Sequence, residues 1–185
     1  MLQTLFGRHA IAPEREARMN TQQNLFLKMV APAAQAAQKK WSVPASVTIA
    51  QAILESGWGK SALAQQANNF FGIKAVAHAQ ADSYAEFKTS EFVDGRRTAE
   101  MAKFARYASP TDCFAAHAVL LALTSRYRPA MIVADDPSHF CAELQLCGYS
   151  TNPQYAASLR ALIAEFDLTQ YDLQPDGPAA AQTAA

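Results

Sequence analysis

The stretch AQAILESGWGKSALAQQANNFFGIK, residues 50–74, contains one acidic residue, Glu55, at the end of a run of apolar and small residues. On a helix that turns ~100° per residue, the apolar side chains of residues 47–54 fill an arc of ~160°. Gln51 and Glu55 both fall just beyond the edge of that arc. The stretch therefore predicts a mostly buried helix with a thin polar strip that carries these two side chains.

Two interpretations of Glu55 are open on this pattern alone. Gly57 is suited to end the helix directly after Glu55, which leaves Trp58 free to fold back near the carboxyl group. A carboxylate beside an apolar face and an indole loses hydration, and this loss raises its pKa, as in the general acid of a glycosidase. The alternative is a solvated glutamate at a helix C-terminus, where the helix dipole disfavours it by ~0.3–1 kcal/mol.

The composition bounds the broad class of the chain. Of its 185 residues, 50% are hydrophobic and 17% are charged, which is typical of a single globular domain. The 16 basic residues balance the 16 acidic ones, so the net charge gives no support for a nucleic-acid partner or an anionic membrane. No apolar run approaches the ~20 residues that a membrane-spanning helix needs. We therefore expect one folded domain with no membrane span.

The cysteines and histidines point to neither a metal centre nor a cofactor. Cys113, Cys141 and Cys147 are too few and too unevenly spaced for a disulfide framework or a zinc site. We expect buried cysteines that act as small hydrophobic residues, with a Cys141–Cys147 disulfide as the alternative. His117 lies in an apolar segment and is expected in the core or at its rim, and no two histidines form a His-x-x-x-His pair.

The chain divides into a domain, residues 20–170, and two tails. Residues 1–19 mix charges with a proline and are expected to form an N-terminal arm, and residues 171–185 a disordered tail. The domain opens with apolar residues at helical spacing over residues 20–41. Pro32 is expected to kink or split this first helix.

Three later helices share one starting device, a capping side chain placed directly before a proline. The three pairs are Ser109-Pro110, Asp136-Pro137 and Asn152-Pro153. We expect the first of these helices to reach about Tyr127, the second to end at Gly148, and the third to reach about Phe166. Earlier in the chain, Pro44 suits the first turn of the helix that leads to the opening stretch.

The middle of the chain predicts a β-hairpin. Asp94-Gly95 separates two runs of apolar and β-branched residues, and this dipeptide is a strong signal for a hairpin turn. We expect strands at about residues 85–93 and 96–101. Helices, a small hairpin lobe and further helices make an α+β fold that is mostly helical, and a cleft between the lobes is the expected place for a site.

A second carboxyl group across such a cleft would complete the pair that most glycosidases use. Glu91 is the candidate on the hairpin, because strand alternation places it on a partly apolar face. Glu86 and Glu100 compete with it from the same hairpin, and a solvated strand residue is the alternative for each.

Two further segments are candidates for binding. Asn69, Phe70 and Phe71 put an amide beside two aromatic rings, which can stack on a sugar and bond its hydroxyl and N-acetyl groups. Core phenylalanines and a capping asparagine are the alternative. Tyr149 lies in an exposed turn between two capped helices, where it serves either packing or chemistry. A Ser-His-Asp hydrolase is poorly supported, because the chain has no Gly-x-Ser-x-Gly motif.

Five stretches of the chain, in the same order, resemble the glucosaminidase domain of glycoside hydrolase family 73, which includes bacterial autolysins and the hydrolase half of flagellar rod-cap proteins. They are AQAILESGWGKSALA, NNFFGIKA, TSEFVDG, FARYASP and LCGYSTNPQYAASL. The resemblance covers about residues 20–166. Two departures are the lack of a tryptophan-glycine pair between Lys74 and Glu91, and an asparagine in GYSTNP where aspartate is common.

The resemblance implies a lysozyme-like fold and a peptidoglycan hydrolase. The expected activity is that of an endo-β-N-acetylglucosaminidase, which cleaves the β-1,4 bond between N-acetylglucosamine and N-acetylmuramic acid. Glu55 matches the family's general acid, Glu91 its acidic hairpin residue and Tyr149 its active-site tyrosine. The expected substrate contacts are Gln51, Trp58, Asn69, Phe70, Phe71 and Tyr155.

Other functions on the same polymer stay open. The alternatives are a muramidase, a lytic transglycosylase and a non-catalytic peptidoglycan-binding module. We expect action in the periplasm or cell wall. The N-terminus lacks the long apolar segment of a secretory signal, which favours non-classical export or delivery by a phage. If the chain is a secreted effector, an immunity protein is a further expected partner.

Overall fold

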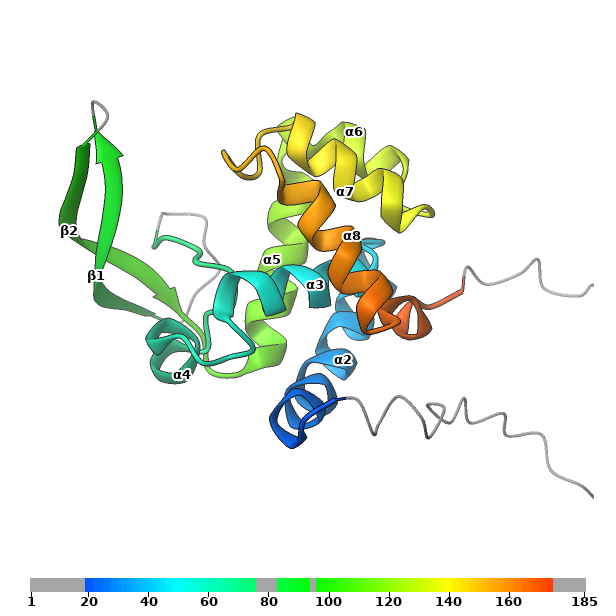
Figure 1. Cartoon of the computed structure of the whole chain (residues 1–185), viewed down its shortest axis with the longest axis horizontal. Helices are drawn as coiled ribbons and strands as arrows, with labels where there is room; N and C mark the ends of the chain where they lie inside the picture. The colour runs from blue at the N-terminus through cyan, green and yellow to red at the C-terminus, as the bar shows by residue number, and fades with distance from the viewer. Residues whose placement is uncertain (1–18, 76–82, 94–95, 175–185) are drawn as a thin grey trace, which may run out of the picture.

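The computed structural model describes residues 19–75, 83–93 and 96–174, without the side chains of residues 89–93 and 96–100. The elements in chain order are α2 (Thr21–Trp41), α3 (Ala45–Ser56), α4 (Ala62–Ala67), β1 (Ser83–Val93), β2 (Arg96–Arg106), α5 (Pro110–Leu123), η1 (Ser125–Tyr127), α6 (Arg128–Ile132), α7 (Pro137–Leu146), α8 (Tyr155–Glu165) and η2 (Leu168–Tyr171). The β1–β2 hairpin projects to one side of a helical body (Figure 1). The predicted α+β class, mostly helical with a small hairpin lobe, is confirmed.

Helix α2 is not split at its proline. Asn20 begins the helix with a capping box, in which its side chain accepts from the N–H of Gln23 and the Gln23 side chain accepts from the N–H of Asn20. Pro32 lies inside the helix, which nevertheless continues to Trp41. Packing of α2 against α3 and α5 stabilises the helix across the hydrogen bond that proline cannot make.

Helix α3 forms the centre of the body. Ten of its 12 residues are buried, and it packs against α2, α7, α8 and η2. Of this helix only Leu54 and Glu55 are exposed. The predicted buried helix is confirmed, but Gln51 lies inside the core at 0% exposure instead of on a polar strip.

Two of the three predicted capping residues, Ser109 and Asp136, begin helices as expected, whereas Asn152 does not cap α8. The Ser109 side chain accepts from the N–H of Asp112 at the start of α5, and the Asp136 side chain accepts from two N–H groups at the start of α7. At α8 the helix begins at Tyr155, and the Asn152 side chain accepts from the N–H of Gln154 before the first turn.

The region from Pro110 to Ile132 differs from the prediction of one helix that reaches about Tyr127. Helix α5 ends at Leu123 because Thr124 is extended, with φ −81° and ψ 117°. A short 3-10 helix, η1, follows, and then helix α6, which the sequence analysis did not predict.

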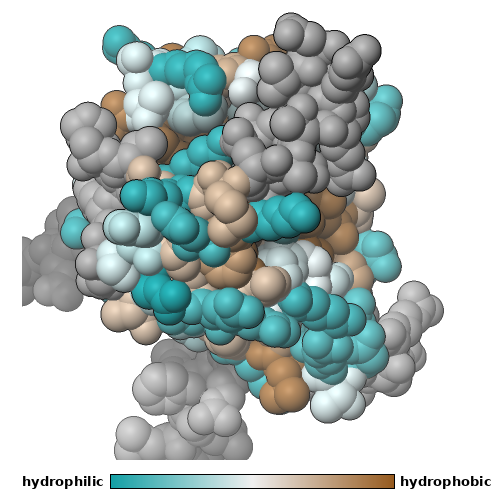
Figure 2. Space-filling model, turned by 90° about the vertical axis from the view of Figure 1, so that its left-hand side faces the viewer, coloured by the Kyte–Doolittle hydropathy of each residue, from teal (hydrophilic) through white to brown (hydrophobic). Residues whose placement is uncertain are grey.

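The hairpin is anchored at its base. Its strands pair antiparallel from Ser83 opposite Arg106 to Val93 opposite Arg96, so β2 extends past its expected end at residue 101. The register fits the two-residue turn expected at residues 94–95, which lie outside the described residues. At the base, the N–H of Ala105 donates to the carbonyl of Ile73 at 2.9 Å, which joins β2 to the segment after α4. Figure 2 faces this side and shows hydrophilic and hydrophobic residues interspersed.

The folded body continues beyond the expected end of the domain at residue 170. An oxygen of the Asp172 side chain accepts from the N–H of Ser46 at 2.7 Å. The Gln38 side chain accepts from the N–H of Leu173 at 2.9 Å and donates to its carbonyl at 3.1 Å. The rest of the expected tail, residues 175–185, and all but one residue of the expected N-terminal arm lie outside the described residues.

The cysteines are free, so the alternative of a disulfide between Cys141 and Cys147 is not realised. Burial raises the pKa of the Cys113 and Cys141 thiols to about 12, which keeps both protonated. Within the described part of the chain, no helix combines the length and the apolar character needed to cross a membrane.

Candidate active site

Glu55 lies at the surface end of the buried helix α3. Gly57 ends the helix in a left-handed conformation, with φ 58°, and its N–H donates to the carbonyl of Ile53. The predicted helix end directly after Glu55 is therefore confirmed. The core packing of α3 fixes the backbone of Glu55, while its side chain keeps an exposed edge.

Tyr155, at the start of α8, is the hydrogen-bond partner of Glu55. Its hydroxyl donates to Glu55 Oε1 at 3.2 Å and accepts from Gln51 Nε2 at 3.0 Å. Gln51 is completely buried and Tyr155 is 2% exposed, so water has little access to the bond between them. The three residues form a chain of hydrogen bonds that runs from the core to the Glu55 carboxyl group.

The surroundings of Glu55 favour its neutral form. Burial of the carboxyl group raises its pKa, and the hydrogen bond from Tyr155 opposes this rise to a smaller extent. One edge of the side chain is exposed, but protein atoms crowd the carboxyl group on its other side, and this crowding has the larger effect on its pKa. The group is therefore suited to hold a proton and release it to a ligand at the surface.

Tyr149 lies next to this chain. Its ring stacks on the ring of Tyr155, with centroids 5.5 Å apart and planes inclined by 20°. Burial, and next to it the charge of Glu55, raises the pKa of Tyr149 well above its ordinary value. Burial likewise raises the pKa of Tyr155 far above its ordinary value. Both phenols therefore stay protonated at neutral pH and act through hydrogen bonds instead of as charged nucleophiles.

His117 of α5 belongs to the same cluster. From the sequence, His117 was expected only in the core or at its rim. Its Nε2 lies 3.0 Å from the Tyr149 hydroxyl oxygen. Complete burial lowers the pKa of His117 to about 3, so the ring is neutral. A signal was available, because a lone imidazole in an apolar helix needs a polar partner when it is buried.

Trp58 lies in a strained turn directly after α3. Gly57, Trp58 and Gly59 have positive φ angles of 58°, 61° and 72°, and such a conformation costs a residue with a Cβ atom about 1–2 kcal/mol. Packing offsets this cost, because the indole makes edge contacts with Phe26 and Phe166 at centroid distances of 5.7 and 4.8 Å. The role of Trp58 as a substrate contact stays a prediction.

Asn69 is buried at 1% exposure and is committed to the backbone. Its Nδ2 donates to the carbonyls of Ile73 and Ala105, both at 2.9 Å. Its Oδ1 accepts from the N–H groups of Phe71 and Ile73, at 3.4 and 3.1 Å. Asn69 therefore joins the loop after α4 to the base of the hairpin, and the expected sugar contact does not hold for a side chain in this position.

Phe70 and Phe71 also belong to the core, with 3% and 6% exposure. Phe70 packs against Phe26 and Phe114, and Phe71 against Phe114 and His117. The alternative of core phenylalanines is therefore correct for direct contacts. Phe71 reaches the site indirectly, because its ring stacks on His117.

Glu91 lies on β1, where its backbone pairs with Thr98. Its side chain lies outside the described residues, so its predicted place opposite Glu55 stays a prediction.

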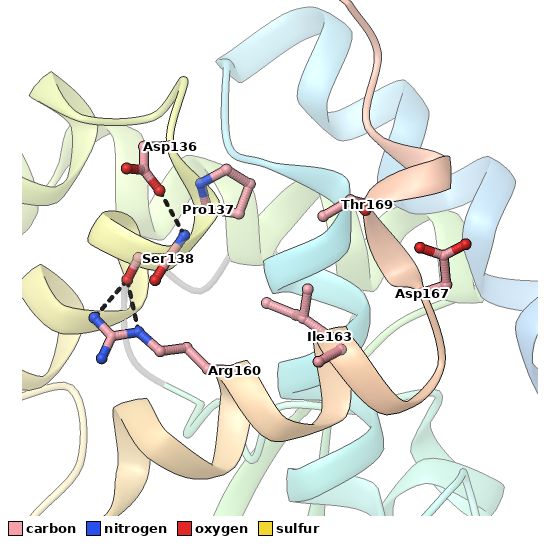
Figure 3. A pocket seen from close by; sticks show the side chains of 8 residues that line it. Asp136, Pro137, Ser138, Arg160, Ile163, Asp167 and Thr169 are labelled. Atoms are coloured by element: carbon pink, nitrogen blue, oxygen red, sulfur yellow. Dashed lines mark hydrogen bonds between the residues drawn. The ribbon is translucent and has the colours of Figure 1, made fainter.

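A separate cavity of about 420 Å³ lies between α7, α8 and η2 (Figure 3). None of its lining residues is a candidate site residue, and two of its charged residues, Arg160 and Asp136, serve the fold. Arg160 Nε and Nη2 donate to the Ser138 carbonyl, and Asp136 caps α7. Across the described residues, no group of histidine, cysteine or acidic side chains is arranged to hold a metal ion.

The site thus combines a carboxyl group of raised pKa with two protonated phenols on a helical body. Over residues 31–168 the sequence matches the glucosaminidase family, described as mannosyl-glycoprotein endo-β-N-acetylglucosaminidase. The chain belongs to this glucosaminidase family. The predicted resemblance is confirmed, and the matched range contains Glu55, Glu91 and Tyr149.

Two curated relatives in this family are the exo-glucosaminidase LytG of Bacillus subtilis and the peptidoglycan hydrolase FlgJ of Pseudomonas aeruginosa. LytG is 34% identical over 163 residues, which is 85% of this chain and 56% of LytG. FlgJ is 36% identical over 149 residues, which is 78% of this chain and 37% of FlgJ. The chain therefore spans between about a third and just over half of the length of these relatives.

Among solved structures, the catalytic domain of the autolysin Auto from Listeria monocytogenes is similar over nearly its whole length. The TM-score is 0.73 at 30% sequence identity, and the match covers 88% of this chain and 99% of that domain. The lysozyme-like glucosaminidase fold is therefore confirmed.

Proposed function

We propose that this chain is a peptidoglycan hydrolase that cleaves the β-1,4 bond between N-acetylglucosamine and N-acetylmuramic acid, with Glu55 as general acid. The observation that carries the proposal is the Glu55 carboxyl group, whose pKa burial raises and whose Oε1 accepts from Tyr155. Two relatives support the polymer and the bond, since one is named a peptidoglycan hydrolase and the other a glucosaminidase.

The first step is proton donation. Because Oε1 accepts a hydrogen bond from Tyr155, Oε2 is the oxygen left to carry the acidic proton. Glu55 gives this proton to the glycosidic oxygen as the bond to the anomeric carbon breaks through an oxocarbenium-like state. The resulting carboxylate is stabilised by the Tyr155 hydroxyl, which Gln51 holds in place.

Two routes complete the reaction after this shared step. In the inverting route, Glu91 takes a proton from the water that attacks the anomeric carbon, with the two carboxyl groups about 6.5–9.5 Å apart. In the substrate-assisted route, the 2-acetamido group attacks, and Tyr149 or Glu91 orients it. The anomer released first separates the routes, because inversion of a β bond gives the α form and retention gives the β form.

The decisive test is Glu55→Gln, with Glu165→Gln on the exposed side of α8 as the matched control. We expect the Glu55 variant to unfold at an unchanged temperature and to lose activity by about 100- to 10,000-fold in release of new reducing ends from purified peptidoglycan. The Glu165 variant should retain full activity. Normal turnover by the Glu55 variant would overturn the assignment.

Mass spectrometry of the products separates the competing functions. Reducing N-acetylglucosamine ends support the proposal, reducing N-acetylmuramic acid ends indicate a muramidase, and anhydro-muramic ends indicate a transglycosylase. Binding without cleavage by the wild type indicates a non-catalytic module.

The proposed place of action is the periplasm or the cell wall, where the substrate lies. An immunity protein that covers the candidate active site belongs to the proposal only if the chain is a secreted effector. Relief of toxicity by a neighbouring gene product, when both are expressed in the periplasm, tests this partner.

A further inference from the structure

His117 is a buried polar residue for which the proposed reaction has no use. It has no exposed surface, and its ring stacks on Phe71 with centroids 3.9 Å apart and planes inclined by 16°. Nε2 pairs with the Tyr149 hydroxyl, whereas Nδ1 is buried and has no hydrogen-bond partner among the described residues. Most buried polar atoms in folded proteins are hydrogen-bonded, so an imidazole kept at this cost calls for a reason.

The ring of His117 has one orientation and two possible tautomers. Stacking on Phe71 fixes its plane, and burial keeps it neutral, so only one of the two nitrogens carries a hydrogen. A hydrogen on Nδ1 leaves a buried N–H without an acceptor. A hydrogen on Nε2 leaves Nδ1 as a bare nitrogen that accepts no hydrogen bond. This second tautomer is favoured, because buried N–H groups without an acceptor are the rarer defect in proteins.

We propose that His117 is a positioning residue whose Nε2–H donates to the Tyr149 oxygen and thereby directs the Tyr149 hydroxyl hydrogen toward bound substrate. The role rests on the proposed function, since it requires a substrate at Tyr149. Without this hydrogen bond, the Tyr149 hydroxyl is free to rotate. The opposite tautomer would use the hydroxyl hydrogen within the protein and offer the substrate an acceptor only.

The neighbours of Tyr149 place its hydroxyl in the same polar cluster as the proton donor. Its ring stacks on Tyr155, and Tyr155 bonds to Glu55. A hydroxyl that donates here is matched to an acceptor on the sugar next to the bond that breaks. Under the proposed function, the carbonyl oxygen of the 2-acetamido group is such an acceptor.

The tautomer is measurable without any substrate. In protein labelled with ¹⁵N-histidine, we expect the NMR signals of His117 to show a protonated Nε2 and a bare Nδ1. The signal is assigned by its loss in His117→Gln. A protonated Nδ1 with a bare Nε2 would overturn the proposal whatever the enzyme does.

A double-mutant cycle tests whether His117 acts through the Tyr149 hydroxyl. His117→Phe keeps an aromatic ring on Phe71 but removes the donor, and we expect kcat on purified peptidoglycan to fall by about 10- to 100-fold. His117→Gln retains an N–H near the same place and should recover most of the loss. In a Tyr149→Phe background, His117→Phe should change kcat by less than about twofold, since the hydroxyl is already gone.

The outcomes are distinct. Equal losses of kcat in both backgrounds mean that His117 supports only the fold, which overturns the proposal. If His117→Phe does not fold, the glutamine variant and the NMR result decide. A wild type that cleaves no peptidoglycan contradicts the proposed function and the substrate-facing half of this proposal, while the NMR result still decides the hydrogen bond.

Discussion

Glu55 and Glu91 are held by two very different parts of the molecule. Glu55 lies on α3, a helix with ten of its 12 residues buried, and its carboxyl group bonds to Tyr155. Glu91 lies on β1, which pairs with β2 in a sheet of two strands. One acid is anchored through the core, and the other is carried by an element that is joined to the body at its base.

The difference matches the two tasks that the proposed mechanism sets. A proton donor needs a raised pKa, and that requires a fixed and crowded environment such as the end of α3. A residue that activates water or orients the acetamido group needs the correct distance, which a hairpin can adjust as substrate enters. The helical body therefore sets the acidity, and we infer that the hairpin sets the separation of the two acids.

The largest effect that separates the two regions is expected from Glu91→Gln, with Glu86→Gln on the same strand as control. We expect a large but incomplete loss of kcat, smaller than that of Glu55→Gln, because the proton donor remains in place. The Glu86 variant should stay near wild-type activity. Equal losses in the two hairpin variants would mean that the hairpin acts only through its overall charge or shape.

Tyr155→Phe tests whether the helical body sets the acidity of Glu55. The hydrogen bond from Tyr155 lowers the Glu55 pKa, so its removal raises that pKa further. A general acid works while it is protonated, and its activity falls as pH rises through its pKa. We therefore expect kcat to fall about tenfold at the optimum and the alkaline limb of the pH–rate profile to move to higher pH.

Tyr171→Phe, which removes a phenol hydroxyl from η2, is the control for that shift. It should leave the pH–rate profile unchanged. An alkaline limb that moves to lower pH in the Tyr155 variant would contradict the assigned direction of the hydrogen bond.

The elements of the fold could be predicted because their signals are local. Ser109 and Asp136 cap helices that begin at the next residue, and Asp94-Gly95 separates two strands of the predicted type. In the β1–β2 pair, Val93 lies opposite Arg96, which is the register that a two-residue turn requires. These predictions needed no knowledge of distant residues. Helix α6 was missed.

The assignments that failed depend on contacts between distant parts of the chain. Helical spacing placed Gln51 on a polar strip, but its partner Tyr155 lies 104 residues away. Asn69 has the composition of a sugar-binding amide, yet Ala105, 36 residues later, accepts one of its hydrogen bonds. The pattern around His117 showed that it needed a partner without showing that Tyr149 supplies it.

Asn69→Ala is expected to affect stability instead of catalysis. The variant loses hydrogen bonds to two carbonyls, one of them fully buried, and to two N–H groups, which predicts a loss of about 2–4 kcal/mol in the free energy of unfolding. Urea denaturation measures this loss, and Gln65→Ala on the exposed face of α4 is the control. A stable Asn69 variant with a raised KM would restore the sugar-binding interpretation.

The smallest effect is a difference in amide hydrogen exchange within the unmodified protein. We expect the amides of residues 49–56 in α3 to exchange only through global unfolding, because that helix is buried on nearly all sides. In β2, Ala105 is 0% exposed and its amide donates to the body, so it should exchange almost as slowly. Met101 is 63% exposed, and the hydrogen-bonded amides of residues 101–103 should exchange faster through local opening of the hairpin. Equal protection along β2 would mean that the hairpin opens only together with α3. In that case Glu91 is held as firmly as Glu55, and the separation of the two acids is fixed by the fold before substrate arrives.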